Sequence, residues 1–181
     1  MTTPSDLERR RQFEDVIAAV YVPLQRYLRR RTDMSSAEDV LGDVLLVLWR
    51  RVPDIPTEGT LPWCYAVGRR CLANHERSVQ RRNRLVSRLA TLAPPPLADD
   101  SGDSSLTEAL DSLSANDREL LRLWAWEQLS PREIADVLGI SPNAASIRLH
   151  RATGRLRQQL SARGLPTLGE LPGRHGTEAS R

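Results

Sequence analysis

The residues best suited to recognition chemistry lie on the outer face of a helix that the sequence predicts for residues 142–161. At about 100° per residue, one side of this helix carries an apolar stripe that must pack inward: Ala145, Leu149, Ala152 and Leu156. The opposite side carries short polar groups, one apolar side chain and an arginine: Asn143, Ser146, Ile147, His150 and Arg151. Such groups near a helix start can bond to base edges and phosphates. This face therefore predicts nucleic-acid recognition.

A tight turn between two short helices is needed to present this face, and the stretch "LSPREIADVLGISPNAASIRLHRA" (129–152) has the signals for one. Ser130 is followed by a proline at the first helical position and by Glu133, which together predict a capping box. Gly139 favours the end of that helix, and Ser141 favours the start of the next. The combination is typical of a helix-turn-helix. The alternative is a plain helical hairpin.

Cys64, Cys71 and His75 form a second candidate group, on a predicted helix. A cysteine beside a histidine can act as a nucleophile or begin a zinc site. No fourth ligand or acidic partner is evident near them in the sequence, and their apolar neighbours favour packing. Positions 64 and 71 of one helix lie about 10 Å apart, too far for a disulfide. We therefore expect reduced core cysteines, with no catalysis, no cofactor and no metal.

Arginine dominates the second half of a long helix predicted for residues 61–88. Only Glu76 opposes the positive charges there. All 26 Lys-plus-Arg positions of the chain are arginine, which makes planar, bidentate contacts with phosphate and guanine. Because the sequence has no lysine, a P-loop and Schiff-base chemistry are excluded.

The net charge of +3 is unevenly distributed along the 181 residues. Residues 1–91 hold 16 arginines against 11 acids, and residues 114–181 hold 10 arginines against 7 acids. Residues 92–113 hold five acids and no basic residue. The pattern predicts two modules that could meet polyanions, joined by a connector that could not.

A further helix is predicted over 37–51, "AEDVLGDVLLVLWRR", and it is apolar over more than one face. We expect it to be largely buried. Two serines before it, with acids three residues later, predict a capping box. Gly42 in its interior costs about 0.8–1 kcal/mol relative to alanine. Asp39 and Asp43 lie on its exposed side, where they could meet basic groups of a partner.

The fold class that these patterns predict is all-α, because helical spacing recurs and no period-2 run is long enough for a strand. We expect two small helical domains joined by a flexible acidic linker. The expected segments are a flexible N-terminus (1–12), a helical bundle (13–90), an acidic proline-rich linker (91–106), a helix-turn-helix domain (107–162) and a flexible tail (163–181). No run of roughly 18 apolar residues and no signal core is present, so we expect a cytoplasmic protein without membrane insertion.

Together these segments resemble the extracytoplasmic-function (ECF, group 4) sigma factors, members of the sigma-70 family of RNA polymerase subunits. "SSAEDVLGDVLLVLWRR" resembles their region 2.2, and "LPWCYAVGRRCLANHERSVQRR" resembles regions 2.3–2.4. "LSANDRELLRLWAWEQLSPREIADVLGISPNAASIRLHRATGRLRQQL" resembles region 4. The resemblance implies a sigma factor, not an enzyme, that binds core RNA polymerase and directs promoter-specific transcription initiation.

The resemblance also implies a role for each candidate set. The polymerase β′ clamp helices would be bound through Asp39, Gly42 and Asp43. The −10 element would be bound and melted through Trp63, Arg69, Arg70, Asn74, Arg77, Arg81 and Arg82. The −35 element would be read by Asn143, Ser146, Ile147, His150 and Arg151. The acidic linker would follow the basic RNA path of the polymerase, and its β subunit would be a further contact.

Three departures from the family pattern affect these roles. Gly42 and Asp43 stand where Gln-Glu is usual, which keeps one acid and loses one amide. Arg70 stands where an asparagine near the flipped base is common. Ala144 and Ala145 stand where relatives often have Thr-Val, so a hydroxyl at the helix start is lost. We therefore expect base preference to differ, with more dependence on DNA shape at the −35 element.

Two other interpretations remain open at this point. A LuxR-type or two-component regulator could carry a similar C-terminal domain, although its receiver would need strands and a lysine. An enzyme or zinc protein would depend on the Cys64, Cys71 and His75 group. An anti-sigma partner is common in the resembled family, and the sequence leaves its presence open.

Overall fold

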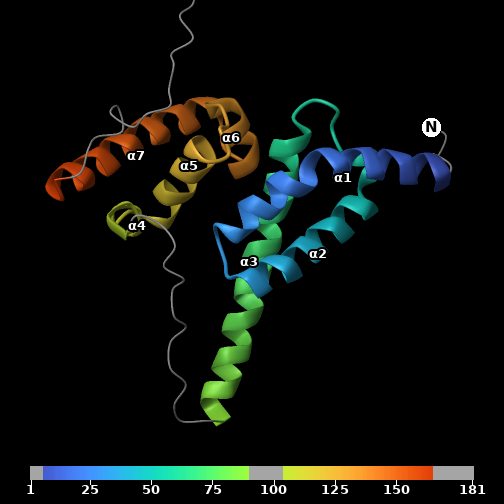
Figure 1. The fold of residues 1–181 in the computed structure, drawn as a ribbon, viewed down its shortest axis with the longest axis horizontal. Helices are drawn as coiled ribbons and strands as arrows, with labels where there is room; N and C mark the ends of the chain where they lie inside the picture. Colours follow the sequence, from blue (N-terminus) through green and yellow to red (C-terminus); the bar gives the residue numbers. More distant parts are fainter. Residues whose placement is uncertain (1–5, 90–103, 165–181) are drawn as a thin grey trace, which may run out of the picture.

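The computed structural model describes residues 6–89 and 104–164, and within these ranges the chain is helix and loop without a strand (Figure 1). The all-α prediction is confirmed. The elements in order are α1 (Asp6–Arg29), α2 (Met34–Arg50), the 3-10 turn η1 (Val52–Asp54), α3 (Thr60–Leu89), α4 (Ser104–Asp111), α5 (Ala115–Ala125), α6 (Pro131–Leu138) and α7 (Pro142–Ala162). We call α1–α3 the front domain and α4–α7 the rear domain. None of these helices is long and apolar enough to span a bilayer.

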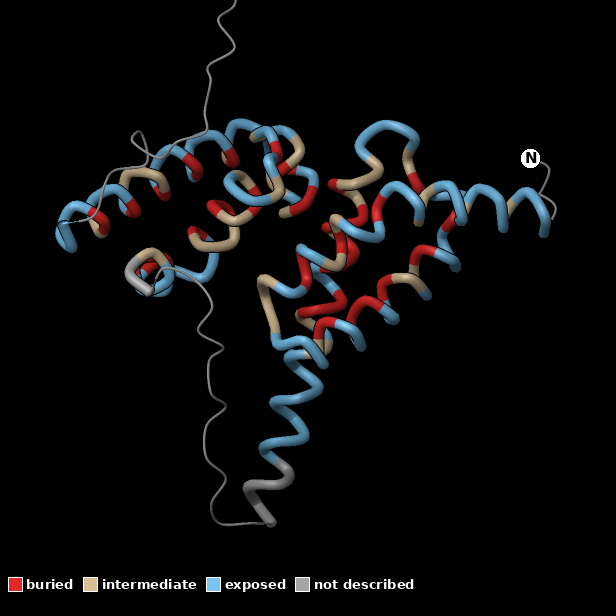
Figure 2. Tube along the Cα trace, in the orientation of Figure 1, coloured by how far each residue is buried: buried red, intermediate tan, exposed pale blue. Residues whose placement is uncertain are grey.

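The front domain buries one stripe of each of its three helices against the other two. Its fully buried large side chains come from all three helices: Leu24, Tyr27, Leu28, Leu48 and Tyr65. In Figure 2 the buried segments of α1, α2 and α3 face one another, whereas the second half of α3 projects away from the bundle and is exposed. Residues on that projecting half are therefore free to contact another molecule.

Helix α1 begins earlier than its apolar spacing predicts. We expected a flexible segment over 1–12, but the helix starts at Asp6, so the expectation is wrong for residues 6–12. The cause is a tertiary contact with the end of α2. The Nη2 of Arg9 donates to the carbonyl of Trp49 at 2.9 Å, and its guanidinium lies 5.0 Å from the Trp49 ring centroid. Gln12 also donates to the carbonyl of Val52.

Helix α2 is less buried than predicted, because only one of its faces packs into the bundle. The buried face has helical spacing: Ala37, Val40, Leu41, Val44 and Leu48. Leu46 and Trp49 on the outer side remain 54% and 38% exposed. Gly42 is also exposed, and a Cβ there would meet no atom within 4 Å, so no close neighbour requires the glycine.

The cap of α2 lies a few residues before the predicted serines, and α5 is capped by a serine. Asp33, not a serine, caps α2 by accepting from the Ser36 backbone N–H at 3.0 Å, and this bond lowers the pKa of its carboxyl. Ser114 caps α5 by accepting from the Asp117 N–H at 3.2 Å. Asn116 and Glu119 also have capping-box spacing, which would predict a cap at Asn116, but Glu119 instead pairs with Arg31.

The rear domain packs α7 against α4, α5 and α6. The predicted inward stripe of α7 is confirmed, as its four members are at most 9% exposed. The predicted linker over 91–106 lies outside the described residues up to 103, and α4 already begins at Ser104. The predicted flexible tail over 163–181 lies outside the described residues from 165 onward.

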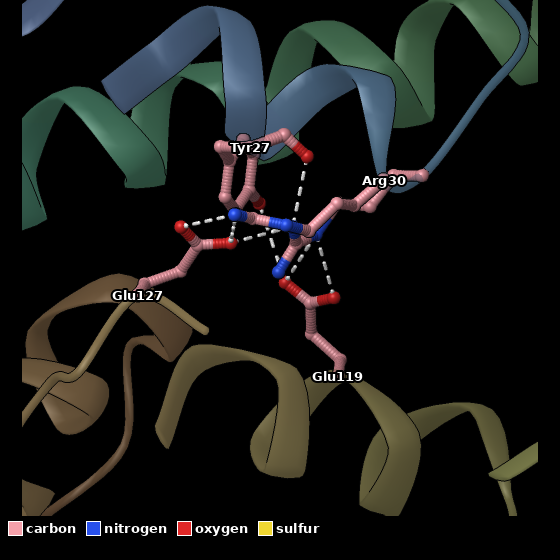
Figure 3. Close-up of polar contacts among 5 residues, drawn as sticks. Tyr27, Arg30, Glu119 and Glu127 are labelled. Atoms are coloured by element: carbon pink, nitrogen blue, oxygen red, sulfur yellow. Dashed lines mark hydrogen bonds and ion pairs between the residues drawn. The ribbon is translucent and has the colours of Figure 1, made fainter. Parts of the chain in front are cut away.

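The two domains are in contact, with α3 against α6 and the end of α1 facing α5. Figure 3 shows a polar network between them. The Nε of Arg31 contacts Glu119 Oε2 at 2.9 Å, and its Nη1 contacts Glu127 Oε1 at 3.1 Å. Arg30 contacts Glu127 Oε2 at 3.1 Å, and the hydroxyl of Tyr27 donates to Glu119 at 3.2 Å. We call these five residues the interdomain latch.

Candidate nucleic-acid interface

The helix-turn-helix predicted in the rear domain is present as α6, a turn and α7. Ser130 and Glu133 form the complete capping box, with reciprocal side-chain-to-backbone bonds. Gly139 ends α6 at φ +67°, a left-handed conformation that favours glycine. Ser141 caps α7 by accepting from the Ala144 N–H at 3.2 Å. Each local signal in the sequence therefore has its structural counterpart.

All five side chains predicted for −35 recognition are exposed on the outer side of α7: Asn143, Ser146, Ile147, His150 and Arg151. Ile147 is 45% exposed, which is unusual for an isoleucine on an otherwise packed helix. The Ser146 hydroxyl donates to the Pro142 carbonyl at 3.0 Å, so its oxygen remains available as an acceptor. Arg155, one turn further on, instead pairs with Asp117 of α5 and so holds α7 against its neighbour.

The seven residues predicted for the −10 element all lie on α3, but they do not form one group. Arg69, Arg70, Asn74 and Arg77 are exposed on the part of α3 that faces α5. Arg77 is held by the Ala73 carbonyl at 3.0 Å and by Asn74 Oδ1 at 2.9 Å. Arg81 and Arg82 lie further along, on the projecting half (Figure 1).

Trp63 stands apart from these cations, in the first turns of α3. It is half-buried, and the guanidinium of Arg51 lies 5.2 Å from its ring centroid. A cation over an aromatic face is favourable by about 0.5–1 kcal/mol at exposed sites. The structure therefore places Trp63 beside the end of α2, and the arginines of α3 begin about two turns further along the helix.

The contact between domains brings together residues from both predicted DNA-binding sets. Arg69 of α3 and Arg151 of α7 line one cleft of about 310 Å³ between the domains. Sequence reasoning missed the interdomain latch that creates this proximity. Its trace in the sequence is the run Arg29-Arg30-Arg31, which resembles an ordinary solvated helix end.

A shallow apolar groove of about 690 Å³ contains the residues predicted to bind polymerase. Asp39, Gly42 and Asp43 lie along it, and all three are exposed. Its apolar lining comes from residues that the sequence prediction did not include: Phe13, Leu45, Leu46 and Trp49. Phe13 and Trp49 meet edge to face, with ring centroids 5.2 Å apart. The available signal was helical spacing, which places Leu46 and Trp49 on the same face of α2 as Asp39 and Asp43.

The cysteine and histidine group lacks the features of a reactive site. Cys64 is fully buried, and burial raises the pKa of its thiol to about 12. Burial, with the nearby charge of Asp43, also raises the pKa of Cys71. A nucleophilic cysteine needs a lowered pKa, so these environments oppose the chemistry. Across residues 6–89 and 104–164, no three His, Cys, Asp or Glu residues are grouped as metal ligands.

Both thiols are therefore expected to resist alkylation by iodoacetamide in the native protein at pH 8. With a pKa of about 12, Cys64 has on the order of a thousandfold less thiolate than a free cysteine. Mass spectrometry would follow modification in buffer and in denaturing urea, where both cysteines should react rapidly. Native-state labelling of Cys64 at the denatured rate would contradict the buried assignment.

Comparison with known proteins places these helices in a family. A family model described as "Sigma-70, region 4" matches residues 103–156. An ECF RNA polymerase sigma factor of Mycobacterium tuberculosis, SigL, is 31% identical over 78% of this chain and 85% of its own length. The RNA polymerase sigma factor CarQ of Myxococcus xanthus is 34% identical over 82% of this chain and 88% of its own length.

Solved structures agree in fold. The sigma factor RpoE, crystallised with the anti-sigma factor NepR from Bartonella quintana, superposes with a TM-score of 0.63 at 20% identity. It matches 82% of this chain and 96% of its own. CnrH, in complex with the cytosolic domain of CnrY, gives a TM-score of 0.58 at 24% identity, over 84% of this chain and 90% of its own.

Two helical domains, one of them a helix-turn-helix with an exposed polar recognition face, define a DNA-binding protein of the transcription apparatus. The chain belongs to the ECF sigma factors of RNA polymerase, and its role is in transcription initiation. This membership excludes the two alternative interpretations. The front domain is helical where a receiver would need strands, and the relatives are polymerase subunits, not enzymes.

Proposed function

We propose that this sigma factor reads the −35 element with α7, engages and helps melt the −10 element with α3, and binds core polymerase through the groove on α2. One observation carries the proposal. Of the twelve side chains assigned to DNA, all except Trp63 are exposed, and they occupy two helices in separate domains. A chain with two such surfaces can contact one promoter at two places, provided that a partner holds the domains at the required separation.

Recognition of the −35 element is supported by the geometry of α7. Its apolar stripe is fixed against α5 and α6, so the outer face has a defined orientation. Asn143 and Arg151 provide hydrogen-bond donors for base edges or phosphates, and Ile147 can contact a thymine methyl group. Ala144 carries no hydroxyl at the helix start, which favours a larger contribution from DNA shape.

Engagement of the −10 element is supported by the exposed cations of α3. Arg81 and Arg82 project beyond the bundle, where a nucleic-acid backbone can approach without meeting the rear domain. Unstacked bases are held by aromatic or guanidinium planes. Arg70 offers such a plane at the position where relatives commonly have asparagine, which predicts an altered base preference in the opened strand.

The α2 groove is suited to a basic helix of the polymerase β′ subunit. Leu46 and Trp49 supply exposed apolar area, while Asp39 and Asp43 supply negative charge beside it. An apolar patch with a charged rim is typical of a protein-binding surface. The same chain can also have an anti-sigma partner, a proposal supported by the structural neighbour RpoE, a sigma factor crystallised with the anti-sigma factor NepR.

Replacement of Leu46 by glutamate is expected to weaken binding to core polymerase by at least about tenfold, or about 1.4 kcal/mol. The new carboxylate would be desolvated within an apolar contact, at a position exposed enough to leave the fold intact. Val22→Glu is the matched control, since Val22 is 51% exposed on α1 and does not line the groove.

The measurement is binding of fluorescent sigma factor to purified core polymerase, followed by transcription in vitro from a promoter library and from templates with a scrambled −35 element. Wild type and Val22→Glu should bind equally and transcribe only from intact promoters. Equal binding by Leu46→Glu would remove the groove from the polymerase interface. Equal transcription from scrambled templates would contradict −35 recognition.

A further inference from the structure

A second cleft between the domains, larger than the one that Arg151 lines, has arginine as its most frequent lining residue. It has a volume of about 730 Å³, within the range of about 300–1,000 Å³ that is usual for small-molecule sites. The front domain contributes four cations and the rear domain two: Arg31, Arg69, Arg70, Arg77, Arg118 and Arg122. Only two acids, Glu76 and Glu119, line the same cleft. Contact between the domains therefore brings like charges face to face.

The existing partners do not neutralise this charge. Glu119 is already committed to Arg31 and to the Tyr27 hydroxyl. Arg118 contacts Asp111, outside the cleft lining, and donates to carbonyls at the end of α4. Within the described residues, Arg69, Arg70 and Arg122 make no hydrogen bond or ion pair. The guanidinium groups of Arg69 and Arg70 thus line the cleft without a hydrogen bond or ion pair to any described residue. The nearby charges of Glu119 and Asp111 act on Arg122, but neither carboxylate forms an ion pair with it.

Two further guanidinium groups at the cleft are not fully satisfied by the protein, one because a donor lacks an acceptor and the other because burial and like charges oppose its charged form. The Nη2 of Arg31 is buried without a hydrogen-bond partner, although the side chain is only 6% exposed. A buried unpartnered donor costs about 1–3 kcal/mol, and more when it is charged. Arg122 is half-buried on α5, where burial first, and then the charges of Arg31 and Arg118, lower the pKa of its guanidinium.

The N-terminus of α5 adds a further donor surface. Ala115 and Asn116, in its first turn, line the cleft. The first backbone N–H groups of a helix have no intrahelical acceptor and carry partial positive charge. Ser114 satisfies only the N–H of Asp117. The cleft therefore combines arginine forks with helix N–H groups, the two kinds of donor that bind phosphate most effectively.

We propose that this cleft is a binding site for a small polyphosphate anion, and that the bound anion stabilises the closed arrangement of the two domains. An anion with several charges can contact arginines of both domains at once, which converts their mutual repulsion into a shared attraction. The volume suits a chain of a few phosphates, either inorganic or carried by a nucleotide. Arg69, Arg70, Asn74 and Arg77 would then face the anion rather than DNA, a consequence that rests on the proposed function.

Calorimetric titration of the full chain, at constant ionic strength and without DNA or polymerase, tests the site independently of promoter recognition. Inorganic tripolyphosphate should bind at one site per chain, and more tightly than orthophosphate. Arg122→Gln and Arg70→Gln should each weaken binding by at least about tenfold, since each removes a charge-assisted contact. Arg132→Gln is the matched control, as Arg132 is exposed in the rear domain and lines neither cleft.

Small-angle scattering at saturating tripolyphosphate should show a radius of gyration no larger than that of the free chain. Titration with adenosine triphosphate shows whether the site prefers a nucleotide or an inorganic polyphosphate. If adenosine triphosphate binds more tightly than tripolyphosphate, the site recognises the nucleotide; if the two bind equally, it recognises the phosphates alone. Absence of saturable binding would overturn the proposal, as would equal weakening by Arg132→Gln. A different result would assign the cleft to a DNA strand and overturn the proposal. In that case a single-stranded oligonucleotide would bind and Arg122→Gln would weaken its binding, whereas neither tripolyphosphate nor adenosine triphosphate would bind.

Discussion

Replacement of Arg31 by methionine is expected to separate the two domains without unfolding either of them. Arg31 is the centre of the interdomain latch, since it contacts both Glu119 and Glu127 across the interface. Burial alone would lower the pKa of its guanidinium, but the charge of Glu119, the bond to Glu119 and the charge of Glu127 outweigh burial and raise it. The folded state thus favours the charged arginine strongly.

The expected loss of free energy depends on how deeply the two carboxylates that contact Arg31 are buried. The Glu127 side chain is 3% exposed and that of Glu119 is 18% exposed. Breaking a buried ion pair by removing one partner costs about 3–5 kcal/mol. After the substitution Glu119 keeps the Tyr27 hydroxyl but has no cation, and Glu127 keeps Arg30. Methionine keeps most of the apolar stem of arginine but loses the guanidinium that lies over the Tyr27 ring. The domains can avoid the cost by moving apart and hydrating both carboxylates.

Small-angle scattering and the hydrodynamic radius measure this separation directly, and circular dichroism checks that the helices persist. Arg30→Met is the matched control. The Arg30 side chain is 33% exposed and contacts only Glu127, so its loss should cost about 1 kcal/mol or less and leave the chain compact. An unchanged radius for Arg31→Met, or an equal expansion for Arg30→Met, would show that the latch does not hold the domains together.

Local structure was predictable in the helix-turn-helix, where the signals act over a few residues. In the helix-turn-helix, Ser130, Glu133, Gly139 and Ser141 act on residues at most four positions away, and each has its predicted role. The apolar stripe of α7 was also predictable from the sequence, because helical spacing alone decides which side chains share a face.

The features that sequence reasoning missed depend on partners far away in the chain. Helix α1 extends back to Asp6 because Arg9 meets Trp49, forty positions later. Glu119 has the spacing of a capping residue for Asn116, yet its carboxylate pairs with Arg31, eighty-eight positions away. A charged residue has many possible partners in a sequence rich in arginine, so pattern alone does not select among them. The clefts between the domains depend on these long-range pairings, because the pairings hold the two domains together.

Replacement of Tyr27 by alanine is expected to destabilise the front domain by about 3–5 kcal/mol, the usual range for deleting a large buried ring. Tyr27 is fully buried and connects three parts of the structure. Its ring stacks on Tyr65 with centroids 4.7 Å apart and lies 3.6 Å from the Arg31 guanidinium carbon. A Cβ at Gly68 would already lie 3.4 Å from the ring, so α3 packs tightly against it.

Tyr27→Phe is the matched variant, because it keeps the ring and removes only the hydroxyl that donates to Glu119. It should cost about 0.5–1.5 kcal/mol, the usual contribution of one hydrogen bond. Urea denaturation, followed by circular dichroism, gives the free energy of unfolding for both variants. A loss as large for phenylalanine as for alanine would contradict the view that ring packing provides most of the stabilisation.

The two tyrosines also predict how stability depends on alkaline pH. Burial, and then the charge of Glu119, raise the pKa of the Tyr27 hydroxyl, and burial with the charge of Glu127 raises that of Tyr65. In the unfolded chain a tyrosine ionises near pH 10. The folded state disfavours the ionised form, so stability is fully present below about pH 10 and is lost as pH rises above it. Tyr27→Phe should reduce this alkaline slope but not abolish it, because Tyr65 remains. An unchanged slope would mean that Tyr27 ionises as readily in the folded protein as in the unfolded chain.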